Sequence, residues 1–188
     1  IQSLLEHLKK GQFHFLKGSL ETAKKHYATL AAMKHIANWD QPERKVIHYA
    51  HLRLAQLEEN PSRKMKQLLQ ALQFDPKQVI DRKLFPPPLV SSYTQLKKQN
   101  PVKVYSLPKS FEKFSKILVN GQIKKDHSSF FRSRGGEVRI SFLSNRWKEF
   151  HVITKPENLE TMTLPIQALA SGSCDQPQFN VTENSSHS

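Results

Sequence analysis

The hydrophobic period changes once along this chain, close to residue 100, and this change constrains the fold more than any other feature. Before it, apolar residues recur at helical spacing, as in Leu68, Leu69 and Leu72. After it they alternate, as in Val138, Ile140 and Phe142, which is typical of strands. The sequence therefore predicts an α+β protein, with antiparallel helix pairs first and a small antiparallel β-sandwich after them.

About five helices are predicted in the first part of the chain. Breaks at Gly18-Ser19, at Asn60-Pro61-Ser62 and at the prolines 86–88 separate most of them. Ser19 is expected to cap the second helix. The expected helices cover about residues 1–17, 19–34, 42–57, 62–73 and 89–98. We expect the first four to form two antiparallel pairs, and the fifth to cover the open end of the second pair.

The first pair resembles a tetratricopeptide repeat. The residues that carry the resemblance are small, small, apolar, small and aromatic in that order: Gly11, Gly18, Leu20, Ala23 and Tyr27. Small residues let two helix backbones approach, and the aromatic ring fills the space between them. The second pair ends with Ala71-Leu72 and Asp75-Pro76, which is similar to the end of that repeat, but Leu52 stands where its first glycine is expected. The resemblance implies a concave binding surface.

Short strands and tight turns are predicted after residue 101. Asn120-Gly121 suits a two-residue hairpin between strands 116–119 and 122–124. Gly135-Gly136 is expected to turn a second hairpin between 130–132 and 138–142, with Arg139 and Ser141 facing outward. Further strands are expected at 102–107, 147–154 and 161–168. Short strands at this spacing predict the sandwich.

The strand region is similar to the PEGA-type domain of bacterial envelope proteins. Its hairpin from Ile117 to Gly121 is followed by Gly136 to Ile140 and by a strand through Phe150 and Val152. The Pro-Glu-Gly-Ala signature is absent, and Ser110 to Phe114 stands near that place. The resemblance implies a periplasmic or cell-envelope protein, with the cytoplasm as the alternative.

Three regions follow from these patterns: a TPR-like helical domain at 1–99, a PEGA-like β-sandwich domain at 100–170, and a flexible polar tail at 171–188. The chain begins at Ile1 instead of Met, so a removed leader is expected. No apolar run approaches the ~18 residues that a membrane span needs. We therefore expect no transmembrane segment.

The chemistry of an enzyme is not indicated. The single cysteine, Cys174, allows no intramolecular disulfide and no cysteine-based zinc site. His48 and His51 lie three residues apart, but no nearby ligand completes a metal set. Cys174 and His187 lack a third group to orient them. We predict a non-catalytic protein with no metal and no cofactor.

A protein or peptide partner is predicted for the helical region. The repeat alignment places five residues on the concave surface: Gln12, Phe15, Tyr49, Arg53 and Gln56. An aromatic ring beside an arginine and two amides suits a peptide strand or a terminal carboxylate. The alternative is that Phe15 and Leu16 are core residues and the others are simply exposed.

A second interpretation gives the binding role to the β-domain. The net charge of +13 suits an acidic partner, such as nucleic acid or an anionic envelope polymer. Five basic residues on the predicted strands would contact it: Arg132, Arg134, Arg139, Arg146 and Lys148. Nearby aromatic residues could stack on bases. The alternative is that the aromatic residues form the core and the arginines coat it.

Overall fold

The structure is a computed structural model of the 188-residue chain. It describes residues 2–33, 41–109, 111, 116–120, 122–123, 130–143, 150–159, 161–162 and 179–180. The chain divides into two compact units. The first contains Ile1–Lys103 and the turn Ser133–Gly136, and the second contains Val104–Arg132 and Glu137–Ser188.

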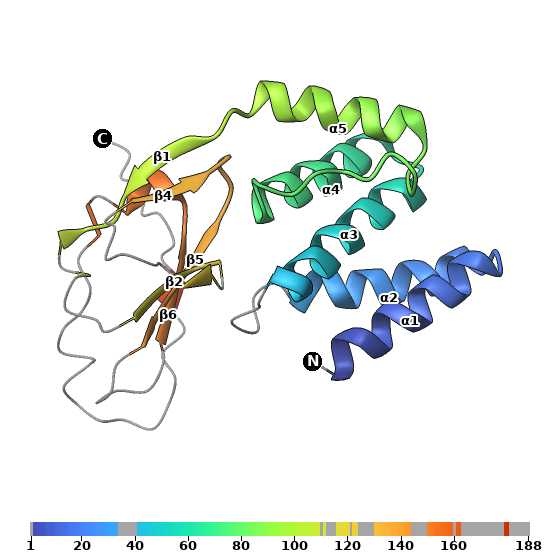
Figure 1. Cartoon of the computed structure of the whole chain (residues 1–188), viewed down its shortest axis with the longest axis horizontal. Helices are drawn as coiled ribbons and strands as arrows, with labels where there is room; N and C mark the ends of the chain where they lie inside the picture. The colour runs from blue at the N-terminus through green and yellow to red at the C-terminus, as the bar shows by residue number, and fades with distance from the viewer. Residues whose placement is uncertain are drawn as a thin grey trace, which may run out of the picture. The chain divides into compact units, whose positions relative to one another are not determined.

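The described residues of the first unit form five α-helices, which confirms the predicted number and order (Figure 1). They are α1 (Gln2–Leu16), α2 (Leu20–Ala32), α3 (Gln41–Leu57), α4 (Pro61–Phe74) and α5 (Pro87–Gln99). Each boundary lies within about two residues of the expected one, because Gly, Asn and Pro mark the ends. Pro61 and Pro87 occupy first-turn positions, where the missing N–H has no cost.

Helices α1 and α2 form a hairpin that depends on two glycines. Gly18 adopts a φ of +77° in the connection, a conformation that glycine tolerates well. Gly11 lies against the buried ring of Tyr27, and a Cβ at Gly11 would be 2.9 Å from Tyr27 Cε1. The small residue therefore permits the close approach that the sequence indicated.

The connection before α2 and the connection before α4 begin the following helix in different ways. Ser19 occupies the N-cap of α2 but its side chain makes no capping hydrogen bond, so the expected side-chain cap is wrong. Its φ of −80° and ψ of 67° lie outside the extended conformation that a typical cap has. Asn60 caps α4 instead: the Arg63 N–H donates to its Oδ1 at 3.1 Å.

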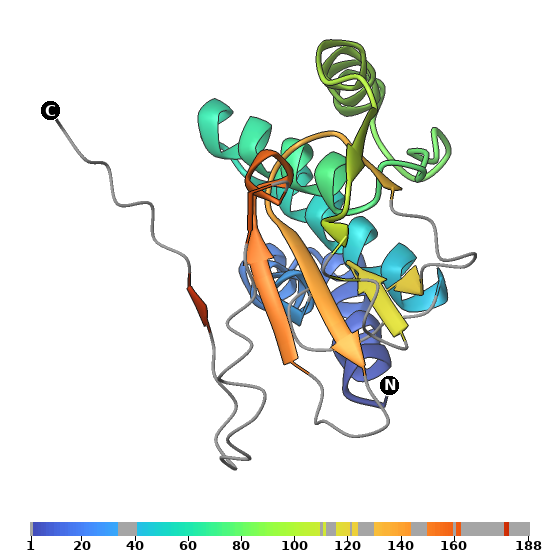
Figure 2. The same ribbon diagram turned by 90° about the vertical axis from the view of Figure 1, so that its left-hand side faces the viewer.

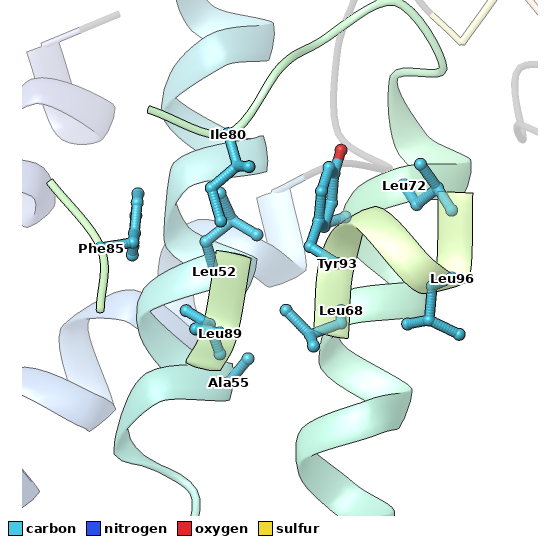
Figure 3. Close-up of a cluster of buried hydrophobic side chains, with 10 residues drawn as sticks. Leu52, Ala55, Leu68, Leu72, Ile80, Phe85, Leu89, Tyr93 and Leu96 are labelled. Atoms are coloured by element: carbon cyan, nitrogen blue, oxygen red, sulfur yellow. The ribbon is translucent and has the colours of Figure 1, made fainter. Parts of the chain in front are cut away.

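Helix α5 covers the second helix pair, as expected. Its residues Leu89, Tyr93 and Leu96 are buried against α3 and α4. Figure 3 shows these side chains gathered with Leu52 and Leu68. The full cluster also takes residues from the linker between α4 and α5: Leu52, Ala55, Leu68, Ala71, Leu72, Ile80, Phe85, Leu89, Tyr93 and Leu96. The linker is therefore part of the core.

The strands that the structure describes form two sheets, mostly within the second unit (Figures 1 and 2). The smaller sheet pairs β1 (Lys103–Ser106) with β4 (Phe130–Ser133). The larger has the order β3-β2-β5-β6-β7. Its strands are β2 (Lys116–Val119), β3 (Gln122–Ile123), β5 (Val138–Leu143), β6 (Phe150–Thr154) and β7 (Phe179–Asn180). One hydrophobic cluster takes side chains from both sheets, including Phe131, Val119, Ile140 and Val152.

The first predicted hairpin is confirmed and the second is not. Strands β2 and β3 pair antiparallel with Val119 opposite Gln122, and Asn120 has a φ of 49°. Gly135 and Gly136 do form a turn, with φ values of 89° and 77°. However, that turn leads from β4 to a strand of the other sheet, where β5 pairs with β2 and β6.

The central place of β5 corrects a second expectation. Arg139 and Ser141 were expected to face outward, but they are only 8% and 1% exposed. Their neighbours Val138, Ile140 and Phe142 are buried as well, so β5 is buried on both faces. A regular alternation of polar and apolar residues does not by itself show that one face meets water.

Part of the C-terminal region was also predicted differently. Thr161 and Met162, at the start of the expected strand 161–168, are not in a strand, and the rest of that range lies outside the described residues. Phe179–Asn180 lies in the polar tail, which was expected to be loose or held only by Phe179 and Val181. This segment pairs parallel with β6, with Val152 opposite Phe179.

Candidate functional site

Four of the five residues predicted to bind a partner come together in the first unit. Tyr49, Arg53 and Gln56 follow one another along one face of α3, as spacings of four and three residues require. The Arg53 Nε donates to the Tyr49 hydroxyl at 2.7 Å, and its Nη1 donates to Gln56 Oε1 at 2.6 Å. Nη1 also donates to the Leu84 carbonyl at 3.1 Å.

Three aromatic rings surround the Arg53 guanidinium. Its central carbon lies 4.4 Å from the ring centre of Phe15, 4.6 Å from that of Phe85 and 5.0 Å from that of Tyr49. A cation over an aromatic face is attracted by the negative face of the ring, by about 0.5–2 kcal/mol depending on its exposure to water. We call Phe15, Tyr49, Arg53 and Phe85 the Arg53 cage.

A buried tyrosine supports the cage from behind. Tyr27 of α2 is fully buried and meets Tyr49 edge to face, with ring centres 6.1 Å apart. Burial raises the pKa of Tyr27 well above its usual range, and the neighbouring Tyr49 adds to this effect. Tyr27 is also the ring that packs on Gly11. The position of the cage therefore depends on the close packing of α1 and α2.

Most of the guanidinium is engaged by the protein, and one nitrogen remains. Arg53 is 7% exposed. Nε and both N–H groups of Nη1 are used by the hydrogen bonds above. None of these three hydrogen bonds uses Nη2. Nη2 is therefore the candidate nitrogen for contact with an external anion.

Exposed apolar side chains stand next in sequence to two cage residues. Leu16 follows Phe15 and is 84% exposed, while Leu84 precedes Phe85 and is 50% exposed. Gln12 is exposed one turn before Phe15 and joins none of the described contacts. The alternative expectation was therefore wrong for Leu16 and Arg53, since Leu16 lies at the surface and Arg53 is buried. Phe15 is half-buried.

A network that the sequence interpretation missed fixes the linker after α4. The carboxylate of Asp75 accepts from the Arg44 Nε at 3.3 Å, and both residues are about 2% exposed. Asp75 also accepts from the Lys77 N–H and from the Gln78 side chain, each at 3.2 Å. Arg44 donates further to the Phe74 carbonyl. The sequence signal for this network is Asp75, an acidic residue that stands directly after a predicted helix and before Pro76.

The histidines considered as metal ligands have separate partners. His48 Nε2 lies 2.9 Å from the Tyr93 hydroxyl, and His51 Nδ1 lies 2.9 Å from Gln67 Oε1. Burial lowers the pKa of His48 to about 4 and raises that of Tyr93 to about 12. Both groups are therefore neutral near pH 7, and they link α3 to α5.

The residues proposed for a polyanion are not equally accessible. Arg132 is exposed on β4, on the same face as the exposed Phe130. Arg139 is buried in β5, and its Nη2 lies 3.2 Å from His151 Nδ1. Arg146 and Lys148 lie outside the described residues.

Arg134 is engaged by backbone carbonyls within the first unit. Its Nη1 donates to the carbonyls of Asn100 at 2.8 Å and Lys97 at 3.2 Å. Its Nε donates to the carbonyl of Pro76 at 3.4 Å. This arginine thus satisfies carbonyls at the end of α5 and in the linker.

Two further features of the described residues concern membrane crossing and metal binding. No helix there combines the length and the apolar character that a membrane crossing requires. In the same residues no group of three or more His, Cys, Asp or Glu side chains is placed to hold a metal ion. Comparisons of the chain with protein-family models, with curated proteins and with solved structures found no match.

Proposed function

We propose that the helical unit is a short tetratricopeptide-like module that binds a protein partner through a carboxylate at the Arg53 cage. The single observation that carries this proposal is a cation held in place by three rings and three hydrogen bonds, none of which uses Nη2. A prepositioned arginine loses little side-chain entropy when it binds a carboxylate.

The surroundings of the cage favour a peptide over a small acid. Leu16 and Leu84, the sequence neighbours of Phe15 and Phe85, are exposed, and exposed large apolar side chains can contribute to a protein-binding surface. Gln12 and Gln56 offer amide groups that can pair with the backbone of an extended peptide. The partner segment is therefore expected to end in a carboxylate, or to carry an acidic side chain, next to an apolar residue.

The repeat-like architecture supports the same role. Two helix hairpins, the contact of Gly11 with Tyr27, and a covering helix α5 are the features that such an array needs. We also propose that the two sheets of the second unit form a β-sandwich, because both sheets contribute to one hydrophobic cluster. A place in the bacterial cell envelope rests on the PEGA resemblance alone, and the location of the protein in cell fractions would test it.

The binding proposal is tested by introducing a negative charge at the residue that follows Phe15. Leu16→Glu places a carboxylate next to Phe15 on an exposed position, so the fold should be unaffected. Pull-down or calorimetry with a captured partner should show at least about tenfold weaker binding. The matched control is Leu5→Glu, an exposed leucine on the same helix about 16 Å away. Equal binding by the wild type and both variants would remove the cage from the interface.

Arg53 itself needs a stability control. Because its guanidinium is buried among three rings, Arg53→Gln is expected to lower the free energy of unfolding by about 2 kcal/mol. The variant should therefore be tested at a temperature where circular dichroism shows that it is folded. Under that condition it should bind the partner at least about tenfold more weakly, since a charged hydrogen bond is lost.

A further inference from the structure

Three histidines gather on the surface shared by α1 and α2, and none of them belongs to the Arg53 cage. His7 and His14 stand two turns apart on α1, and His26 stands on α2 beside them (Figure 1 shows the two helices side by side). The ring centres of His7 and His26 are 5.4 Å apart, and those of His14 and His26 are 5.8 Å apart and stacked. All three side chains are partly exposed.

The two nearest nitrogens have the spacing of ligands on one ion. His7 Nδ1 and His26 Nδ1 are 3.1 Å apart and form a hydrogen bond, so one of them carries a proton and the other accepts it. Zinc–imidazole bonds are about 2.0–2.1 Å long, so two nitrogens on one ion at an angle near 100° lie about 3.1 Å apart. A cation would therefore take the place of the shared proton, and the ring that donated it would carry its proton on Nε2.

Glu6 stands directly before His7 on α1, and its carboxylate accepts a hydrogen bond from Lys10 Nζ. Because Lys10 balances the Glu6 charge, we do not count this carboxylate as a ligand. The neutral imidazole is the form that binds a metal, so the two rings are the ligands of the site.

We propose that His7 and His26 form a two-histidine site for a divalent ion of the Zn²⁺, Cu²⁺ or Ni²⁺ class. Imidazole nitrogens are preferred ligands of these ions. Water completes the coordination, since no third His, Cys, Asp or Glu in the described residues is placed to join. Because the ligands come from two helices, the ion fastens α1 to α2. Binding is thus linked to the stability of the hairpin that carries Phe15.

The site is tested on the full chain with Zn²⁺ as the probe. After treatment with EDTA and its removal, titration calorimetry at pH 7.5 should show one site that is lost in His7→Gln and in His26→Gln. Above the dissociation constant, each tenfold increase in the Zn²⁺ concentration should raise the unfolding midpoint of the wild type by about 3–6 °C. Neither single variant should show this rise.

His14→Gln is the matched control, because it removes a neighbouring imidazole that does not share the 3.1 Å contact. It should change the zinc affinity less than about threefold. A long-range ¹H–¹⁵N spectrum of the histidine rings should show Zn²⁺ shifting the Nδ1 signals of His7 and His26. The proposal is overturned if the wild type and the His7→Gln/His26→Gln double variant bind Zn²⁺ equally, or if other histidines carry the shifts.

Discussion

Arg53 has a structural role, and we propose that it also contacts a partner. The repeat alignment predicts its position on α3 as a contact for a partner. Most of its guanidinium is already used inside the protein, by Tyr49, Gln56 and Leu84. These contacts would hold Nη2 in a fixed position for the proposed carboxylate.

Gly11 provides a direct test of the packing that supports the cage. Gly11→Ala should lower the free energy of unfolding by about 1–2 kcal/mol, because its Cβ meets the buried Tyr27 ring and overpacking outweighs the gain in helix propensity. The unfolding midpoint should fall by several degrees. Lys9→Ala, an exposed change on the same helix, should be neutral. A stabilised Gly11→Ala variant would mean that Tyr27 has room to move.

His48 should make stability depend on pH. Its pKa is lowered to about 4 by burial, whereas an unfolded histidine titrates near 6.5. The folded protein favours the neutral ring, so this contribution is complete above pH 6.5 and is lost as the pH falls towards 4. The loss should be on the order of 3 kcal/mol.

Urea unfolding between pH 7 and pH 4 measures this effect. His48→Gln keeps a group that can pair with the Tyr93 hydroxyl but cannot titrate. The difference in unfolding free energy between wild type and variant should narrow as the pH falls through this window. A constant difference would show that His48 is protonated in the folded state or has the same pKa in both states.

The segment between α4 and α5 shows how charge can fix a linker. Asp75 and Arg44 are buried as a pair, and Asp75 also accepts from the Lys77 N–H and the Gln78 side chain. A paired carboxylate at the end of α4 determines where the chain goes next. Ile80 and Phe85 are then placed in the core beneath α5.

Removing one member of the pair should therefore be costly. Asp75→Ala should lower the free energy of unfolding by about 3 kcal/mol, because it leaves the Arg44 charge buried without its partner. Adding Arg44→Met to that variant should recover part of the loss. Chemical denaturation of the wild type, the two single variants and the double variant gives the coupling free energy between Asp75 and Arg44. Additive effects would show that the ion pair contributes nothing to the folded state.

The helices were predictable because local signals agree with the packing. Proline, asparagine and glycine mark the ends, and the apolar period persists between them. The pairing of strands was less predictable, because Gly135-Gly136 indicates a turn but not the sheet that the chain enters next. Similarly, the alternation around Ile140 does not reveal that β5 is the centre of a sheet. The third ring of the cage, Phe85, comes from a linker that periodicity does not assign to either helix pair.

The distribution of charge over the whole chain bears on the second interpretation. The net charge of +13 is spread over both units, while Arg134 and Arg139 are engaged by carbonyls and by His151. Binding to single-stranded DNA should therefore be diffuse, measurable at low salt and lost near ~150 mM salt. Arg132→Gln should change the affinity of the protein for single-stranded DNA by less than about twofold. Salt-resistant binding that this variant abolishes would instead favour a built site on β4.

The proposed function depends on the Arg53 cage receiving a carboxylate. The most direct measurement is an NMR titration of the labelled full chain with a pool of short peptides that end in an apolar residue, prepared either with a free C-terminal carboxylate or with an amide. The free-carboxylate pool should shift the side-chain signals of Arg53 and the backbone signals of Phe15 and Leu16, and the amidated pool should do so at least about tenfold more weakly. Equal shifts from both pools, or shifts confined to other parts of the chain, would contradict it.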